Sequence, residues 1–217
     1  MIQTDGKVFE DRGVVYVQTT RPAVDNLSDE VSVIWRDNRS RTGEQNRKAW
    51  ALMSEIATFM GEEKDVVYKQ LALDYTAKNL ETLQGMLFHL STASVSEASA
   101  FITMLVNLII EYDIPTREPL YQLCEDVEKY VYACLINKKC AICGKKADLH
   151  HVDRIGAGYN RLTKPQIGAR VMPLCRVHHG EVDTLGQTAF DEKYHVQAVP
   201  MDARIAQKYH ITGKAAS

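Results

Sequence analysis

Apolar residues recur along this chain at two different spacings, and they predict a small sheet followed by several helices. Segments 7–20 and 30–36 are rich in β-branched and aromatic residues that partly alternate with polar ones, which is typical of strands. From residue 43 onward the apolar positions lie three and four residues apart, as on the inner face of a helix. The expected fold class is therefore α+β. The predicted helices span about residues 43–60, 62–75, 79–90, 96–112 and 119–136.

Residues at the predicted helix ends support these boundaries. Thr42, followed three residues later by Gln45, forms a capping-box pattern before the first helix. Pro119 is favoured in the first turn of the last helix. Beyond about residue 136 the charge and the content of metal-binding residues change together. We therefore predict two domains, 1–135 and 136–217.

The composition is that of a globular protein rather than a membrane protein. The chain has 217 residues, of which 45% are hydrophobic. Its longest apolar run, 101–110, is interrupted by Thr103 and Asn107 and is too short to cross a bilayer. The first residues do not resemble a secretion signal. A soluble, cytoplasmic protein without membrane contact is expected.

The small net charge of −2 conceals a segregated distribution. Residues 55–130 carry five Lys/Arg against thirteen Asp/Glu, a net charge of −8. Residues 136–180 carry nine against two, a net charge of +7, and residues 36–48 carry five against two. Basic segments suit a polyanionic partner, since each neutralised phosphate releases counterions. The candidates for DNA-backbone contacts are Arg36, Arg39, Arg41, Arg47 and Lys48 in the first basic segment, and Lys145, Lys146, Arg154, Arg161, Lys164, Arg170 and Arg176 in the second.

Cysteines and histidines at metal-ligand spacing are concentrated after residue 139. Cys140 and Cys143 are separated by two residues, and so are Cys175 and His178. In a reducing compartment such pairs indicate zinc binding rather than disulfides. Spacing alone would also allow His179 as the fourth ligand, but His178 repeats the gap of the first pair. We predict a structural Zn²⁺ site made of three cysteines and His178.

A second group of metal-binding residues overlaps the first in the sequence. His179 and Asp183 are four residues apart on a predicted helix and therefore share a face. Together with His150 they could hold one divalent ion and leave positions for water and a phosphate oxygen. His151 then remains as a spare base, since imidazole exchanges protons near neutral pH. This combination favours phosphodiester hydrolysis over metal storage.

Residues 140–195, with the sequence Leu-Cys-Arg-Val-His-His at 174–179, resemble the HNH endonucleases, in particular those encoded by phages. The resemblance implies a ββα-metal (His-Me finger) fold with a structural zinc. It also implies His151 as general base, and His150, His179 and Asp183 as ligands of a catalytic ion. Many members have histidine where this chain has Asp183, and aspartate favours Mg²⁺ or Mn²⁺, with Zn²⁺ a further option. Where the family has an asparagine that orients the base, this chain has Arg170, and Asn160 is the candidate replacement.

Residues 36–51 resemble another family. A block of arginines, then Gln-Asn-Arg-Lys at 45–48 and a tryptophan at 50, is similar to the phage lambda Orf (NinB) recombination mediators. This resemblance implies binding of single-stranded DNA, contact with single-strand binding protein and a homodimer. Judged from its residues alone, the block is a turn into a helix with arginines that point outward. Arginine suits phosphate contacts and base stacking.

Two hypotheses follow. In the first, an Orf-like part delivers a metal-dependent HNH endonuclease to single-stranded or branched DNA, with double-stranded DNA as a further substrate. In the second, the substitutions at residues 170 and 183 have removed cutting, and the protein is a non-catalytic recombination mediator. A zinc-dependent transcription factor is less attractive because no helix carries an obvious base-reading face.

Overall fold

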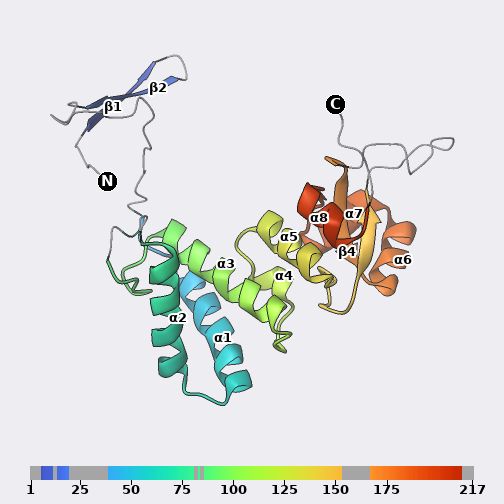
Figure 1. Ribbon diagram of the computed structural model, residues 1–217, viewed down its shortest axis with the longest axis horizontal. Coiled ribbons are helices and arrows are strands. Elements are labelled where there is room, and N and C mark those ends of the chain that lie inside the picture. The colour runs from blue at the N-terminus through green and yellow to red at the C-terminus, as the bar shows by residue number, and fades with distance from the viewer. Residues whose placement is uncertain are drawn as a thin grey trace. The chain divides into compact units, whose positions relative to one another are not determined.

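The computed structural model describes residues 6–11, 14–19, 39–80, 83, 86–152 and 167–211 (Figure 1). The chain forms two compact units, residues 1–36 and residues 37–217. Several predictions fall outside the described residues. They are the strand at 30–36 and the roles of Arg36, Arg154, Asn160, Arg161 and Lys164.

The first unit contains an antiparallel pair of strands, β1 (Gly6–Asp11) and β2 (Val14–Thr19). Val8 pairs with Val17 in this ladder. The strand-like segment 7–20 is therefore two strands rather than one. Strand propensity did not reveal the division because both strands share the same composition, and only two residues separate them.

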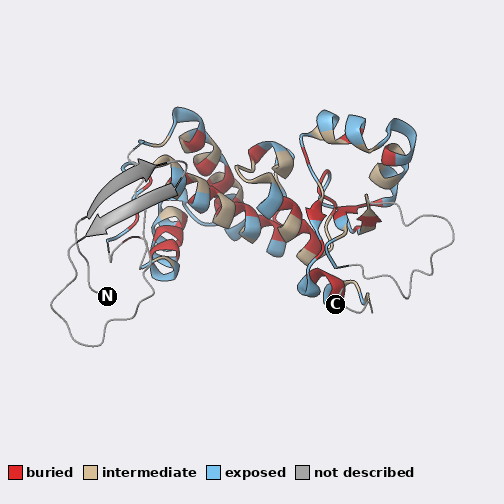
Figure 2. Cartoon of the chain, turned by 90° about the horizontal axis from the view of Figure 1, so that it is seen from above, coloured by how far each residue is buried: buried red, intermediate tan, exposed pale blue. Residues whose placement is uncertain are grey.

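The described residues of the helical part of the second unit form five helices. They are α1 (Gly43–Met60), α2 (Lys64–Lys78), α3 (Val95–Glu111), α4 (Leu120–Leu123) and α5 (Val127–Asn137). The predicted helix at 43–60 is confirmed, together with its capping box between Thr42 and Gln45. Ser94 and Glu97 form a second capping box at the start of α3. Helix α1 packs against α2 and α3, and the buried positions follow the inner faces of these helices (Figure 2).

The helix predicted at 79–90 is wrong for the described residues of that segment, which form turns and irregular structure. The amide of Phe88 donates to Thr76 Oγ1 at 3.0 Å, and that of Leu90 donates to the Tyr68 hydroxyl at 3.0 Å. Both acceptors are side chains of α2. These amides are therefore paired across to a neighbouring helix rather than with carbonyl groups of their own segment.

The helix predicted at 119–136 is interrupted, because α4 and α5 are separate. The side chain of Asp126 accepts a hydrogen bond from the amide of Lys129 and so caps a new helix at α5. The side chain of Glu125 is drawn to α1, where it pairs with Lys48. These two polar contacts outweigh the continuous apolar stripe that predicted a single helix.

The C-terminal part of the second unit is built around a three-stranded antiparallel sheet in the order β3–β4–β5. The strands are β3 (Asp148–His151), β4 (Arg170–Leu174) and β5 (Val199–Pro200). His150 pairs with Met172, and Val171 pairs with Val199. The helices of this part are α6 (Arg176–Leu185) and α7 (Gln187–Tyr194), which lie between β4 and β5 in the sequence, and α8 (Ala203–Lys208), which follows β5.

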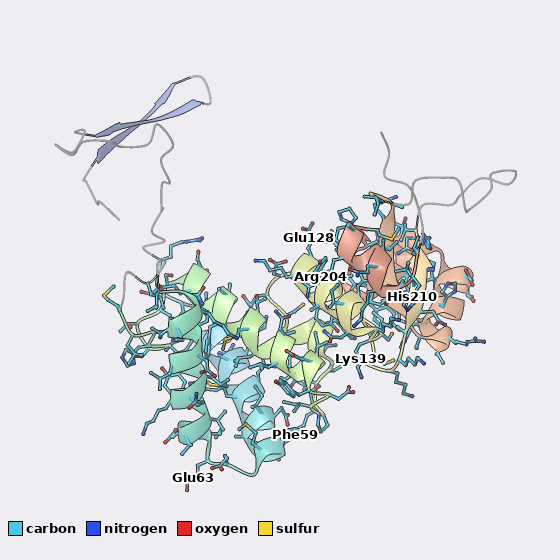
Figure 3. The ribbon with its side chains drawn as sticks, in the orientation of Figure 1. Phe59, Glu63, Glu128, Lys139, Arg204 and His210 are labelled. Atoms are coloured by element: carbon cyan, nitrogen blue, oxygen red, sulfur yellow. The ribbon has the colours of Figure 1, made fainter. Side chains whose placement is uncertain are left out.

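Helix α5 connects the two parts of this unit, because it contacts α3 on one side and β4, β5 and α8 on the other. The Tyr130 hydroxyl donates to the carbonyl of Ala141 at 2.6 Å. Lys139, labelled in Figure 3, forms an ion pair with Asp113, which follows α3. The predicted domain boundary near residue 136 stays a prediction. Among the described residues, no helix is both long and apolar enough to span a membrane.

Gln45 holds the start of α1 to the start of α3. Its side chain is 4% exposed. Its Oε1 accepts from the amide of Thr42 at 3.0 Å, and its Nε2 donates to the carbonyl of Val95 at 3.1 Å and to Ser99 Oγ at 2.9 Å. This residue of the Orf-like block therefore has a structural role.

Replacement of Gln45 by methionine should destabilise the protein, because the buried partners of its amide are left unsatisfied. We expect a loss of about 1–3 kcal/mol in the free energy of unfolding, measured by urea denaturation. Gln70→Met, on the exposed face of α2, is the matched control and should cost less than about 0.5 kcal/mol. Equal effects of the two substitutions would contradict the structural role of Gln45.

Candidate functional site

Three cysteine sulfurs and one histidine nitrogen face a common point between residues 140 and 178, and we call this group the Cys3His cluster. One ligand atom from each of Cys140, Cys143, Cys175 and His178 lies within 4.8 Å of all the others. His178 Nδ1 is 3.4 Å from Cys140 Sγ and 3.3 Å from Cys175 Sγ. Cys143 Sγ is 3.7 Å from Cys175 Sγ. Of the two adjacent histidines, the structure directs His178 to the sulfurs.

These distances fit a tetrahedral ion. Two thiolates bound to zinc at about 2.3 Å would lie about 3.8 Å apart, and a thiolate and an imidazole nitrogen about 3.5 Å apart. The donor set is the soft one that zinc accepts in structural sites. The Cys3His cluster can therefore hold a structural zinc ion.

Local backbone geometry places the four ligands. The segment from Cys140 to Gly144 is a tight turn, in which the amide of Gly144 donates to the carbonyl of Cys140 at 2.9 Å. Gly144 has a φ of 68°, a conformation that favours glycine. Cys175 is the N-cap of α6, so its carbonyl accepts from the amide of His179 at 2.8 Å. The turn supplies two cysteines, and the start of α6 supplies the other two ligands.

Two thiols of the Cys3His cluster have pKa values shifted in opposite directions. Burial raises the pKa of the Cys140 thiol to about 12. Burial would also raise the pKa of Cys175, but hydrogen bonds from the His178 amide and from the thiols of Cys143 and Cys140 lower it below its ordinary value. Thiolates are the form that binds zinc, so metal binding must release protons from this cluster.

His150 and His179 meet at a different face of α6 from the one that carries His178. Together with Asp183 we call them the histidine cluster. His150 Nδ1 is 3.1 Å from His179 Nε2, and the two rings are at an interplanar angle of 83°. His150 is 8% exposed, and burial lowers its pKa, which favours the neutral imidazole. The two nitrogens are close to the separation of about 3.3 Å expected for two imidazoles on one tetrahedral zinc ion.

Asp183 lies near His179, but not at the nitrogen that faces His150. Its Oδ2 is 3.5 Å from His179 Nδ1, and its side chain is 71% exposed. In this conformation the carboxylate is a partner of the outer nitrogen of His179. To share an ion with His150 and His179, the side chain of Asp183 must turn.

Gln187, the residue that contacts the second nitrogen of His150, was not predicted from the sequence. Gln187 Oε1 is 3.0 Å from His150 Nε2, and Gln187 Nε2 donates to Asp191 Oδ1 at 2.7 Å. A lone glutamine at the start of a short helix belongs to no ligand motif. The nearest signal is Gly186, whose φ of 82° allows the turn from α6 into α7.

His151 and the basic residues occupy more varied positions. His151 is half-buried at the end of β3 and has an interaction within the protein. Lys145, Lys146 and Arg176 are exposed beside the Cys3His cluster. Arg170 is exposed at the start of β4. Burial raises the pKa of Asp191, against the opposing effects of the hydrogen bond from Gln187 and the charge of Arg170.

In the basic block at residues 36–48, Arg41 and Lys48 contact other parts of the protein. Arg41 donates through Nε to the carbonyl of Leu90, and Lys48 Nζ lies 2.9 Å from Glu125 Oε1. Arg39 and Arg47 are exposed. Arg41, which was expected to point outward with the other arginines of the block, and Lys48 are held by partners that the local sequence pattern does not show. Their contact with DNA stays a prediction.

Loss of a ligand from the Cys3His cluster should release the ion and loosen the C-terminal part. For purified Cys143→Ser we expect less than one zinc per chain by elemental analysis and a lower midpoint of thermal unfolding than for the wild type, which should carry one. Chelation of the wild type should have the same effect. Cys124→Ser, a half-buried cysteine outside the cluster, is the control. Equal zinc content in the two variants would exclude the site.

Comparison with known proteins was made by family, by curated sequence and by solved structure. The family described as "Putative HNHc nuclease" matches residues 13–211. No curated protein and no solved structure matches the chain. The matched range includes the helices α1 to α5 as well as both clusters. The resemblance of residues 36–51 to the Orf mediators stays a prediction. The chain belongs to the HNHc nuclease family.

Proposed function

We propose that this protein is a metal-dependent endonuclease that hydrolyses phosphodiester bonds in DNA at the histidine cluster. One observation carries the proposal. His150 Nδ1 and His179 Nε2, from a strand and from the helix packed behind it, face each other at 3.1 Å. Membership of the HNHc nuclease family supports nucleic acid as the substrate.

In this proposal His150, His179 and Asp183 hold one divalent ion. Two imidazoles and one carboxylate suit Mg²⁺, Mn²⁺ or Zn²⁺, and three protein ligands leave positions for substrate and water. The exposed side chain of Asp183 has room to turn from His179 Nδ1 toward the ion. When bound, the ion would stabilise negative charge on the phosphate and on the leaving oxygen.

His151 is proposed as the general base, following directly after the ligand His150 on β3. It would accept a proton from the attacking water as the new oxygen–phosphorus bond forms. The bond between phosphorus and the ester oxygen then breaks, and the departing oxygen takes a proton from solvent. The exposed Lys145, Lys146 and Arg176 would hold the flanking phosphates.

The helical part would bring the nuclease to its substrate. Its likeness to the Orf mediators supports single-stranded or branched DNA as the target, in recombination, with single-strand binding protein and a second copy of the chain as partners. Among the described cations of the basic block, Arg39 and Arg47 are assigned to DNA because their side chains are exposed. These cations would add affinity that falls with increasing salt.

A non-catalytic DNA-binding role is the second candidate. It is favoured by Arg170 at the place of the base-orienting asparagine, and by the position of Asp183 at the outer nitrogen of His179. Such a protein would keep the Cys3His cluster and bind DNA without cutting it.

Substitution of the proposed base should abolish cutting and leave binding intact. With supercoiled and single-stranded DNA in Mg²⁺ or Mn²⁺, we expect the wild type to nick and His151→Ala to be slower by about 10²–10⁴-fold. His89→Ala, an exposed histidine of the helical part, is the control and should cut normally. If the wild type binds DNA but does not cut with any of Mg²⁺, Mn²⁺ and Zn²⁺, the nuclease proposal fails and the non-catalytic role remains.

The role of Asp183 can be separated from that of a hydrogen-bond partner. Asparagine can still accept a hydrogen bond from His179 Nδ1, but it lacks the charge that a hard cation prefers. If Asp183 is a metal ligand, Asp183→Asn should bind Mn²⁺ at least tenfold more weakly than the wild type in calorimetric titration. Glu192→Gln removes an exposed charge from α7 and should bind Mn²⁺ like the wild type. An unchanged affinity in Asp183→Asn would assign Asp183 to the outer nitrogen alone.

A further inference from the structure

The buried ring of His150 is held at both of its nitrogens. Nδ1 faces His179 Nε2 at 3.1 Å, and Nε2 faces Gln187 Oε1 at 3.0 Å. His150 comes from β3, His179 from α6 and Gln187 from α7. The ring is therefore fixed between one candidate metal ligand and one residue that has no part in the proposed chemistry.

The chemistry of the amide decides which nitrogen of His150 carries the proton. An amide oxygen only accepts hydrogen bonds, so the nitrogen that faces it must donate. With Oε1 of Gln187 facing Nε2, the proton of neutral His150 lies on Nε2. The lone pair is then on Nδ1, the atom directed to His179 and to the proposed ion.

This assignment requires that the amide of Gln187 cannot turn over, and Asp191 provides the constraint. Gln187 Nε2 donates to Asp191 Oδ1 at 2.7 Å, four residues along α7. A reversed amide would place its oxygen against the carboxylate and its NH₂ group against His150 Nε2. A polar chain thus runs from Asp191 through Gln187 to His150.

We propose that Gln187, oriented by Asp191, is a positioning residue that fixes His150 with its proton on Nε2 and Nδ1 available as a metal ligand. The part of this inference that concerns the ion rests on the proposed function. The part that concerns the proton on His150 does not. Gly186 makes the arrangement possible, since its positive φ returns the chain after α6 so that Gln187 reaches His150.

The experiment reads the proton position directly, by long-range ¹H–¹⁵N correlation of the imidazole rings in protein that holds one zinc ion per chain, at the Cys3His cluster, and none at the histidine cluster. We expect wild-type His150 to carry its proton on Nε2. Gln187→Leu removes the acceptor, so a mixture of the two tautomers is expected. The double variant Gln187→Glu/Asp191→Asn retains an oxygen acceptor at His150 and a donor–acceptor pair between residues 187 and 191, and it should restore the Nε2–H form. Gln197→Leu, which removes an exposed glutamine that contacts Glu128, is the matched control.

The same variants are titrated with Mn²⁺ in the absence of DNA. Loss of an outer-shell partner of a ligating histidine costs about 10–100-fold in metal affinity, and we expect at least the lower value for Gln187→Leu. Gln187→Glu/Asp191→Asn keeps the net charge of the wild type and should bind Mn²⁺ within a few-fold of it. Zinc content and thermal unfolding verify that each variant keeps the Cys3His cluster.

The outcomes separate this inference from the proposed function. Expected tautomers together with a wild type that does not cut DNA would support the role of Gln187 and overturn the nuclease. A wild type with the proton on Nδ1 of His150 would overturn the role of Gln187, whether or not the protein cuts. So would a folded Gln187→Leu whose tautomer and Mn²⁺ affinity match those of Gln197→Leu. If Gln187→Leu does not fold, the tautomers of the wild type and Gln187→Glu/Asp191→Asn decide.

Discussion

The arrangement of the C-terminal part depends on the convergence of three sulfurs and one imidazole at the start of α6. This part has a sheet of only three short strands, and the helices α6 and α7 bury few large side chains. An ion bound at the Cys3His cluster would add stability to a core of this size. The cluster ties the turn at Cys140 to the first turn of α6, and the turn is itself anchored to α5 through Tyr130. The position of α6 relative to the sheet therefore follows from the cluster.

That position in turn determines where the second group of histidines meets. Successive residues on a helix point about 100° apart, so the adjacent His178 and His179 must face different directions. With His178 directed to the sulfurs, His179 is directed to β3, where His150 lies. An ion at the Cys3His cluster would thus set the rotation of α6 and the distance between the two histidine nitrogens. One helix turn serves both clusters, which explains why the two sets of ligands overlap in the sequence.

The sequence was informative wherever the structure depends on local spacing. The pairs Cys140/Cys143 and Cys175/His178 and the capping box of Thr42 could be predicted because each is a contact within a few residues. The break between α4 and α5 could not, since it depends on Glu125 meeting residues of α1 almost 80 positions away. Gln187 was missed for the same reason, as its partner lies 37 residues earlier. Contacts of this kind become visible only when the chain has folded.

The two departures from the family pattern act on different atoms of the site. The side chain of arginine at residue 170 cannot accept a hydrogen bond, so it cannot orient a histidine as an asparagine carbonyl would. The partner that the structure places at His150 Nε2 is Gln187 instead. At residue 183 an aspartate places a negative charge, rather than a neutral ring, next to His179. As a ligand, such a carboxylate oxygen would suit a hard divalent cation better than an imidazole nitrogen does.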